Sequence, residues 1–95
     1  MKITIYQAIN PTFRVDSEKK LYKIGDYKIV YSYNTIAVED SIEDLLENIF
    51  LQFNSGRKPE GYNGHSLSVS DIVEVDNNLY ICDNVGWKQI EWMKD

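Results

Sequence analysis

One stretch of this 95-residue chain restricts the fold more than any other, because its large apolar residues recur at helical spacing and on one side only. Ser41 is suited to cap the start of a helix there, and Asn54-Ser55-Gly56 is suited to end it. A helix with one apolar face needs a second layer to cover that face, and we expect the layer to be a sheet. The apolar positions follow the i, i+3, i+4 pattern of a single helix face: Ile42, Leu45, Leu46, Ile49, Phe50 and Phe53.

Most of the remaining chain has the two-residue alternation that is typical of strands. Residues 2–9 and 27–33 alternate clearly, and residues 66–75, 79–82 and 87–92 predict a C-terminal antiparallel meander. Asp76-Asn77-Asn78 predicts a hairpin turn, because Asn tolerates positive φ. Residues 12–25 predict a long connection with some strand near Leu21. We therefore predict an α+β fold, with a mixed or antiparallel sheet of four or five strands and one amphipathic helix packed across a face.

The composition, 43% hydrophobic and 26% charged, is that of a single globular domain, which we expect to span residues 1–95. No run approaches the roughly 18 apolar residues of a membrane span. The alternating start also lacks the apolar stretch of a secretory signal. The single cysteine, Cys82, leaves no partner for an internal disulfide and no thiolate metal cage. These features predict a cytoplasmic protein.

Charge is distributed unevenly within the net −5 of the chain. Residues 1–35 carry six basic and three acidic side chains, whereas residues 36–95 carry four basic and twelve acidic ones. Nucleic-acid affinity comes largely from neutralising phosphates with Lys and Arg, so a net acidic domain is not expected to bind nucleic acid directly. Attraction to a basic protein surface is compatible with this charge.

Four acids near the start of the predicted helix form the charged pattern with the clearest functional meaning. Their i, i+3, i+4 and i+7 spacing places them on one helix face, roughly 5–6 Å apart. That distance is close to the spacing of phosphates along a nucleic-acid strand, so the stripe could occupy a Lys/Arg-lined channel. A solvated outer face that suits the helix dipole is the simpler alternative, and it stays open. The four acids are Asp40, Glu43, Asp44 and Glu47.

The chain has more aromatic side chains than a core of this size can fully hide, with seven Tyr, three Phe and two Trp. Tyr and Trp are enriched at interface hot spots, so exposed rings would anchor a partner. Half-buried packing on the sheet is an equally good alternative for each ring. The candidates for partner contacts are Tyr31, Tyr33, Tyr62, Trp87 and Trp92.

Residues with catalytic or metal-binding chemistry are few. The single histidine, His65, precedes Ser66 and lies six residues before Asp71, which permits a hydrolase hypothesis. However, the chain has no G-x-S-x-G motif, and a loop histidine that bonds the backbone is the simpler interpretation. The acids of residues 71–76 would alternate between the faces of a strand, which disfavours a shared metal site. We therefore expect no enzymatic activity, no cofactor and no metal.

Three segments of the chain resemble the YodL-like family. The sequence G-H-S-L-S-V-S-D-I-V at residues 64–73 is followed by Y-I-C-D at residues 80–83 and by G-W at residues 86–87. The opening strand and the acidic helix before these segments are also similar to the family, so the resemblance covers nearly the whole chain. Members of this family occur alone or as modules of large polyvalent proteins, on phages, plasmids and integrative elements of Firmicutes. The family has no established catalytic residues, so the resemblance implies none here.

Charge and resemblance together predict a non-enzymatic accessory protein of a mobile element that binds and inhibits a host protein. In its sharpest form, this is an anti-CRISPR or anti-restriction inhibitor whose acidic stripe blocks the nucleic-acid channel of a basic effector such as a CRISPR nuclease. The alternative is a modulator of host cell shape or division that binds a cytoskeletal protein. A third hypothesis is a small hydrolase that uses His65 and Asp71. The oligomeric state and the role of the basic segment 14–28 stay open.

Overall fold

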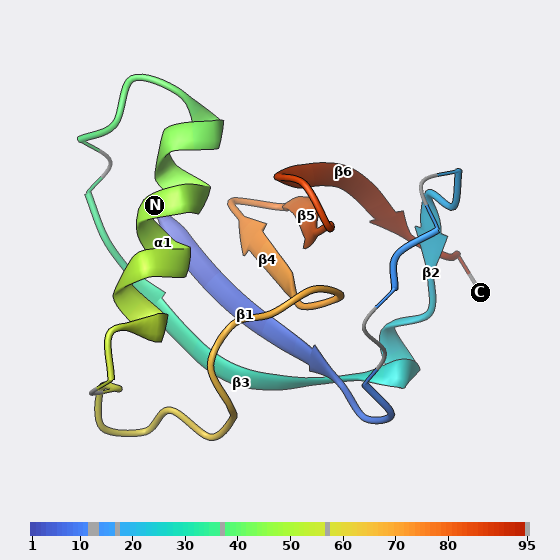
Figure 1. Cartoon of the computed structure of the whole chain (residues 1–95), viewed down its shortest axis with the longest axis horizontal. Helices are drawn as coiled ribbons and strands as arrows, with labels where there is room; N and C mark the ends of the chain where they lie inside the picture. Colours follow the sequence, from blue (N-terminus) through green and yellow to red (C-terminus); the bar gives the residue numbers. More distant parts are fainter. Residues whose placement is uncertain (12–13, 17, 37, 57, 95) are drawn as a thin grey trace.

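The structure is a computed structural model that describes residues 1–11, 14–16, 18–36, 38–56 and 58–94. Figure 1 shows how the elements of this part of the chain are arranged. A short 3-10 turn, η1 (Ile24–Asp26), joins the second strand to the third. The strands and the helix follow in the order β1 (Lys2–Ala8), β2 (Leu21–Tyr22), β3 (Tyr27–Asn34), α1 (Ile42–Asn54), β4 (Ile72–Val75), β5 (Asn78–Cys82) and β6 (Trp87–Trp92).

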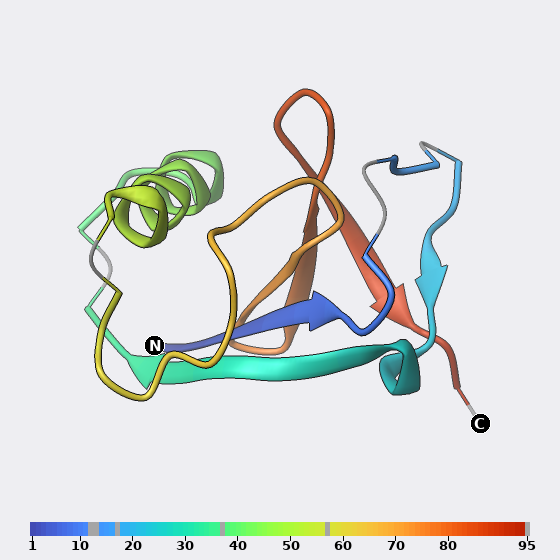
Figure 2. The same ribbon diagram turned by 60° about the horizontal axis from the view of Figure 1, so that its bottom comes forward.

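The described strands form one mixed sheet in the order β2-β6-β5-β4-β1-β3. All neighbours are antiparallel except β2, which runs parallel to β6. The sheet curls into a half-barrel, with β1 and β3 at a steep angle to β5 and β6 (Figures 1 and 2). The predicted α+β class is confirmed, but the described residues form a sheet of six strands rather than four or five. The sixth strand is β2, which lies where the sequence predicts some strand near Leu21, although its two residues are too few to show a period.

Helix α1 begins and ends where the sequence predicts. The Ser41 hydroxyl accepts a hydrogen bond from the Asp44 backbone N–H at 3.1 Å, which caps the first turn. At the other end, the Asn54 side chain exchanges two hydrogen bonds with the backbone of Leu67, at 2.7 and 3.0 Å. The helix end therefore fixes the start of the segment that leads into β4. Within the described residues, no helix is long and apolar enough to cross a membrane.

Each face of the sheet packs a separate apolar cluster, so strand β1, which lies between β4 and β3, is buried on both sides. Tyr6, on one face, packs with Tyr22 of β2 and with apolar residues of β4, β5 and β6. On the other face, α1 covers the residues of β1 and β4. The side chains of this helix-side cluster include Ile3, Ile5, Leu46, Ile49, Phe53, Val73 and Val75.

The β4–β5 hairpin turns as the sequence predicts. Asp76 and Asn77 have φ angles of 50° and 88°, the left-handed conformation that Asn and Asp adopt more readily than most residues. The Asp76 carboxylate also accepts a hydrogen bond from the Lys2 backbone N–H at 2.8 Å. This contact ties the hairpin to the start of β1.

Candidate functional site

The acidic residues at the start of α1 are exposed, but the helix carries three of the four predicted acids. Glu43, Asp44 and Glu47 lie on α1, whereas Asp40 precedes the capping residue Ser41 and lies outside the helix. The prediction that all four share one helix face is therefore wrong for Asp40. No lysine or arginine occurs in the sequence of α1, so its carboxylates have no basic neighbour on the helix itself. This leaves the negative charge of the helix available to a partner.

The segment before α1 folds back along the helix. The Glu39 carboxylate accepts hydrogen bonds from the Asn48 side chain at 2.9 Å and from the Val38 backbone at 3.2 Å. The bond from Asn48 holds the pKa of Glu39 below its ordinary value. Val38 is 83% exposed and Leu51, four residues after Glu47 on the helix, is 63% exposed. Exposed aliphatic side chains therefore accompany the carboxylates of this region.

The β5–β6 hairpin reaches the same helix. Trp87 donates a hydrogen bond from its indole nitrogen to a Glu47 carboxylate oxygen at 3.2 Å. Its ring lies edge-on to Phe50, with 6.4 Å between centroids. Val85, at the hairpin tip, is 92% exposed. We call the region of Asp40, Glu43, Asp44, Glu47, Leu51, Val85 and Trp87 the acidic surface.

Three of the other predicted aromatic contacts surround a buried ring of α1. Tyr31, Tyr33 and Tyr62 lie 5.3–5.8 Å from Phe53 between ring centroids. All three tyrosines are half-buried. Burial is the main cause that raises the pKa of Tyr33 and of Tyr62 to about 12. These contacts favour sheet packing, the alternative to partner binding, for this group.

Trp92 lies on the opposite face of the sheet from α1, within the second cluster. Its ring centroid is 5.2 Å from that of Tyr6 and 5.7 Å from that of Tyr27. Tyr6 donates its hydroxyl to Glu74 at 2.9 Å, and burial with this bond raises the pKa of Tyr6 to about 12. Trp92 is half-buried by this packing, so it is remote from the acidic surface.

A buried polar network lies beneath the segment that resembles the family signature. Its centre is Gln7 of β1, which is fully buried and which the sequence analysis did not single out. The Gln7 amide accepts a hydrogen bond from the His65 backbone N–H at 3.1 Å and donates to the His65 carbonyl at 2.8 Å. It also donates to the Asp71 carboxylate at 3.1 Å. The Tyr62 hydroxyl donates to the same His65 carbonyl at 2.7 Å. The segment is thus fixed to strand β1.

Asp71 closes the turn that leads into β4. Its side chain is 1% exposed and accepts a second hydrogen bond from the Ser68 backbone at 2.9 Å. Its backbone carbonyl accepts from the Cys82 N–H of β5 at 2.8 Å. Burial raises the pKa of Asp71 to about 6, although the bonds from Ser68 and Gln7 and the nearby His65 oppose this rise. Asp71 therefore connects the signature segment to β1 and β5.

Gly64 is required by close packing rather than by an unusual backbone angle. A Cβ at this position would overlap the Gln7 side-chain oxygen and would lie 2.8 Å from Cγ1 of Val30. The preceding residue, Asn63, donates its backbone N–H to the Val30 carbonyl at 2.9 Å, beside an irregularity in the β1–β3 pairing. The glycine, the histidine and the aspartate of the signature thus all have partners within the fold.

Among the described residues, the contacts that the structure shows for His65 and Ser66 do not pair the imidazole with the hydroxyl, as the hydrolase hypothesis requires. The His65 Nδ1 lies 2.6 Å from the Ser66 carbonyl oxygen, while the Ser66 hydroxyl accepts a hydrogen bond from Lys58 at 3.0 Å. The Asp71 carboxylate receives its bonds from Gln7 and Ser68 instead. In the part of the chain that the structure describes, no group of three or more His, Cys, Asp or Glu residues could hold a metal ion.

Comparison with known proteins accounts for the signature. The family model of the YodL-like domain matches residues 2–92. The chain belongs to this family. This YodL-like domain is also 35% identical over 102 residues to the uncharacterized protein R785 of Acanthamoeba polyphaga mimivirus, covering 95% of this chain and 93% of that protein. No solved structure shows a significant match to it. The resemblance predicted from the sequence is confirmed.

Proposed function

We propose that this YodL-like domain is a non-enzymatic binding module whose acidic surface docks onto a basic, nucleic-acid-binding surface of a host protein. The observation that carries this proposal is the contact between Trp87 and Glu47, which joins the acidic helix to the β5–β6 hairpin. Carboxylates, an aromatic ring and exposed aliphatic side chains meet there. This combination is typical of a protein interface with a polar rim.

The two kinds of side chain would contribute differently to binding. Complementary charge mainly speeds association and sets orientation, and its effect weakens as salt screens it. Buried aromatic and aliphatic anchors supply most of the affinity. Trp87 is already held by Glu47 and Phe50, so little side-chain freedom would be lost when a partner covers it.

The viral relative supports the idea that the domain serves a mobile element. In the sharpest form of the proposal, the host protein is a nuclease of a CRISPR or restriction system, and the carboxylates of α1 take the place of phosphates in its channel. Neighbouring acids on a helix face lie roughly 5–6 Å apart, which is compatible with this mimicry. The cytoskeletal alternative has no supporting contact in the structure and is an outcome of the test below.

The test compares two triple variants that change net charge equally. In the first, the helix acids are neutralised as Glu43→Gln, Asp44→Asn and Glu47→Gln. The matched control neutralises three exposed acids elsewhere, as Glu18→Gln, Glu60→Gln and Glu91→Gln. Tagged proteins are used to capture partners from bacterial host lysate at low and high salt, with and without competing DNA, and the partners are identified by mass spectrometry. Circular dichroism checks that α1 remains folded.

The proposal predicts a nucleic-acid-binding protein that is captured by the wild type and by the control triple. The helix triple should lose this partner, and competing DNA or high salt should release it. Equal capture by both triples would refute the role of the acidic surface. A filament protein that DNA does not displace would favour the cytoskeletal alternative instead.

A further inference from the structure

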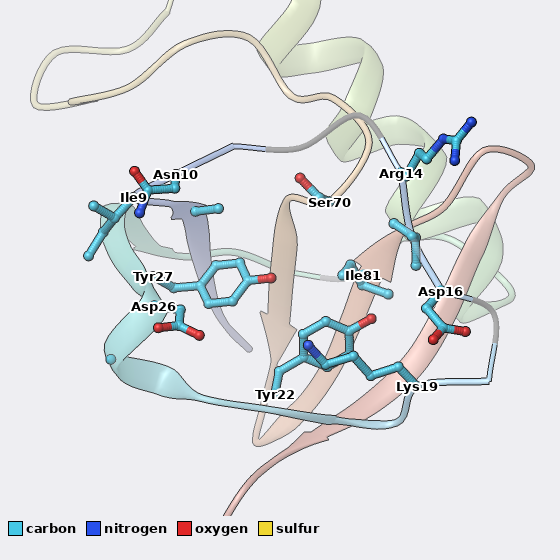
Figure 3. Close-up of a pocket in the computed structure, with 13 residues that line it drawn as sticks. Ile9, Asn10, Arg14, Asp16, Lys19, Tyr22, Asp26, Tyr27, Ser70 and Ile81 are labelled. Atoms are coloured by element: carbon cyan, nitrogen blue, oxygen red, sulfur yellow. The ribbon is translucent and has the colours of Figure 1, made fainter.

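A cavity of about 580 Å³ opens at the end of the sheet remote from α1, beside the basic segment 14–28. Its walls come from the end of β1, the connection after it, β2, η1, the start of β3 and the turn before β4. The volume lies within the range of roughly 300–1,000 Å³ that is typical of small-ligand sites. Figure 3 shows the side chains that line it.

The cavity wall already holds an ammonium group over an aromatic ring. The Lys19 Nζ lies 4.4 Å from the centroid of the Tyr22 ring (Figure 3). The backbone of this turn is fixed, because the Lys19 carbonyl accepts a hydrogen bond from Lys88 at 2.7 Å and its N–H donates to the Asp16 carbonyl at 3.1 Å. The position of the Lys19 ammonium over the Tyr22 ring therefore indicates where a cation fits in the cavity.

Two carboxylates lie beside the tyrosines of the cavity. Asp16 and Asp26 line the cavity itself. Burial and then the charges of Asp16 and Asp83 raise the pKa of Tyr22. Burial and then neighbours that include Asp26 raise the pKa of Tyr27 to about 12. Both hydroxyls are therefore neutral at physiological pH. The charges of Asp16 and Asp26 balance those of Arg14 and Lys19 in the lining, so displacement of Lys19 leaves an excess of negative charge.

Hydroxyl groups also belong to the lining of the cavity. Figure 3 shows the Tyr27 hydroxyl directed into the cavity and the Arg14 guanidinium pointing away from the tyrosine rings, and Ser70 is a further lining residue. Ser70 has a φ of 81°, a left-handed conformation that is uncommon for a residue other than glycine. Such backbone strain is found preferentially at functional sites. Hydroxyl oxygens can accept hydrogen bonds from an ammonium group.

We propose that this cavity binds an organic ammonium group, with its nitrogen over the Tyr22 and Tyr27 rings and with Asp16 and Asp26 as counter-ions. Lys19 occupies the cation position in the free protein and is displaced by the ligand. A free polyamine and a lysine side chain of another protein share this chemistry. The site does not depend on the acidic surface, so either proposal can fail without the other.

The test is a titration of the full chain with putrescine, followed by amide shifts in ¹H–¹⁵N NMR spectra. Lys19→Met removes the competing ammonium, and Lys20→Met is its control, because Lys20 is exposed and does not line the cavity. Asp26→Asn removes a counter-ion, with Glu60→Gln as the control of equal charge. A second titration with Nα-acetyl-lysine methylamide separates the two sources of the ammonium group.

The proposal predicts saturable shifts around Tyr22, Tyr27 and Asp26, with a dissociation constant on the order of 1 mM. Lys19→Met should bind putrescine about two- to fivefold more tightly than Lys20→Met, which corresponds to the loss of one exposed cation–π competitor. Asp26→Asn should bind it more weakly than the Glu60→Gln control.

Each outcome of the titrations bears on the proposal. If Nα-acetyl-lysine methylamide binds as tightly as putrescine, the cavity is assigned to a lysine side chain of another protein. If putrescine alone binds, the cavity is assigned to a free polyamine. The absence of saturable shifts, shifts confined to α1, or equal affinities of Lys19→Met and Lys20→Met would overturn the proposal.

Discussion

Replacing Asp71 by asparagine should change how the stability of this YodL-like domain depends on pH. Burial raises the pKa of Asp71 from 3.8 to about 6, so between these values the folded state binds a proton that the unfolded state has lost. The stabilising contribution of this group is therefore complete below the unfolded pKa and is lost as the pH rises through the folded pKa. A pKa difference of about two units corresponds to about 3 kcal/mol.

Asparagine keeps the size of the side chain and an oxygen that can accept from Gln7 and Ser68, but it does not titrate. All other carboxylates are common to the two proteins, so their effects largely cancel in the comparison. The free energy of unfolding of the wild type minus that of Asp71→Asn should therefore fall by about 2 kcal/mol between about pH 4 and pH 7. Urea denaturation at a series of pH values measures this difference.

The charge of His65 lowers the pKa of Asp71, so the two groups are not independent. The contribution of Asp71 is isolated when the same difference in the free energy of unfolding is measured with His65→Asn added to both proteins. The assignment of a desolvated Asp71 would be refuted if the free energy of unfolding of the wild type minus that of Asp71→Asn stays constant between pH 4 and 7. It would also be refuted if this difference increases as the pH rises.

Two further variants test the packing of the signature segment. Gly64→Ala should destabilise the domain by about 1–3 kcal/mol in thermal or urea unfolding, because its methyl group would meet Gln7. The control Gly25→Ala adds its methyl group to open space and should change the stability by less than about 0.5 kcal/mol. Gln7→Leu should cost about 1–3 kcal/mol, because the buried Asp71 carboxylate loses one of its two hydrogen bonds and the His65 backbone N–H loses its Gln7 partner. Amide exchange in residues 62–68 should then accelerate more than in β6, and equal acceleration in both would contradict a local role.

The candidate surface was only partly predictable from the sequence. The helical spacing of acids indicated Glu43, Asp44 and Glu47, because residues on one helix obey a fixed local geometry. The hydrogen bond between Glu47 and Trp87 joins residues 40 positions apart, so no local pattern indicates it. Gln7 was missed for the same reason, because a polar residue in a strand is expected to be exposed unless a distant segment covers it.

The sequence by itself determined the elements whose cause is local. The cap at Ser41, the apolar face of α1 and the Asp76-Asn77 turn follow from interactions within a few residues, and all three are present in the structure. Tertiary structure alone decided the parallel pairing of β2 with β6 and the enclosure of Gln7 and Asp71 beneath the signature segment. These features depend on contacts between segments that lie far apart in the chain, and such contacts form only when the curled sheet brings the segments together.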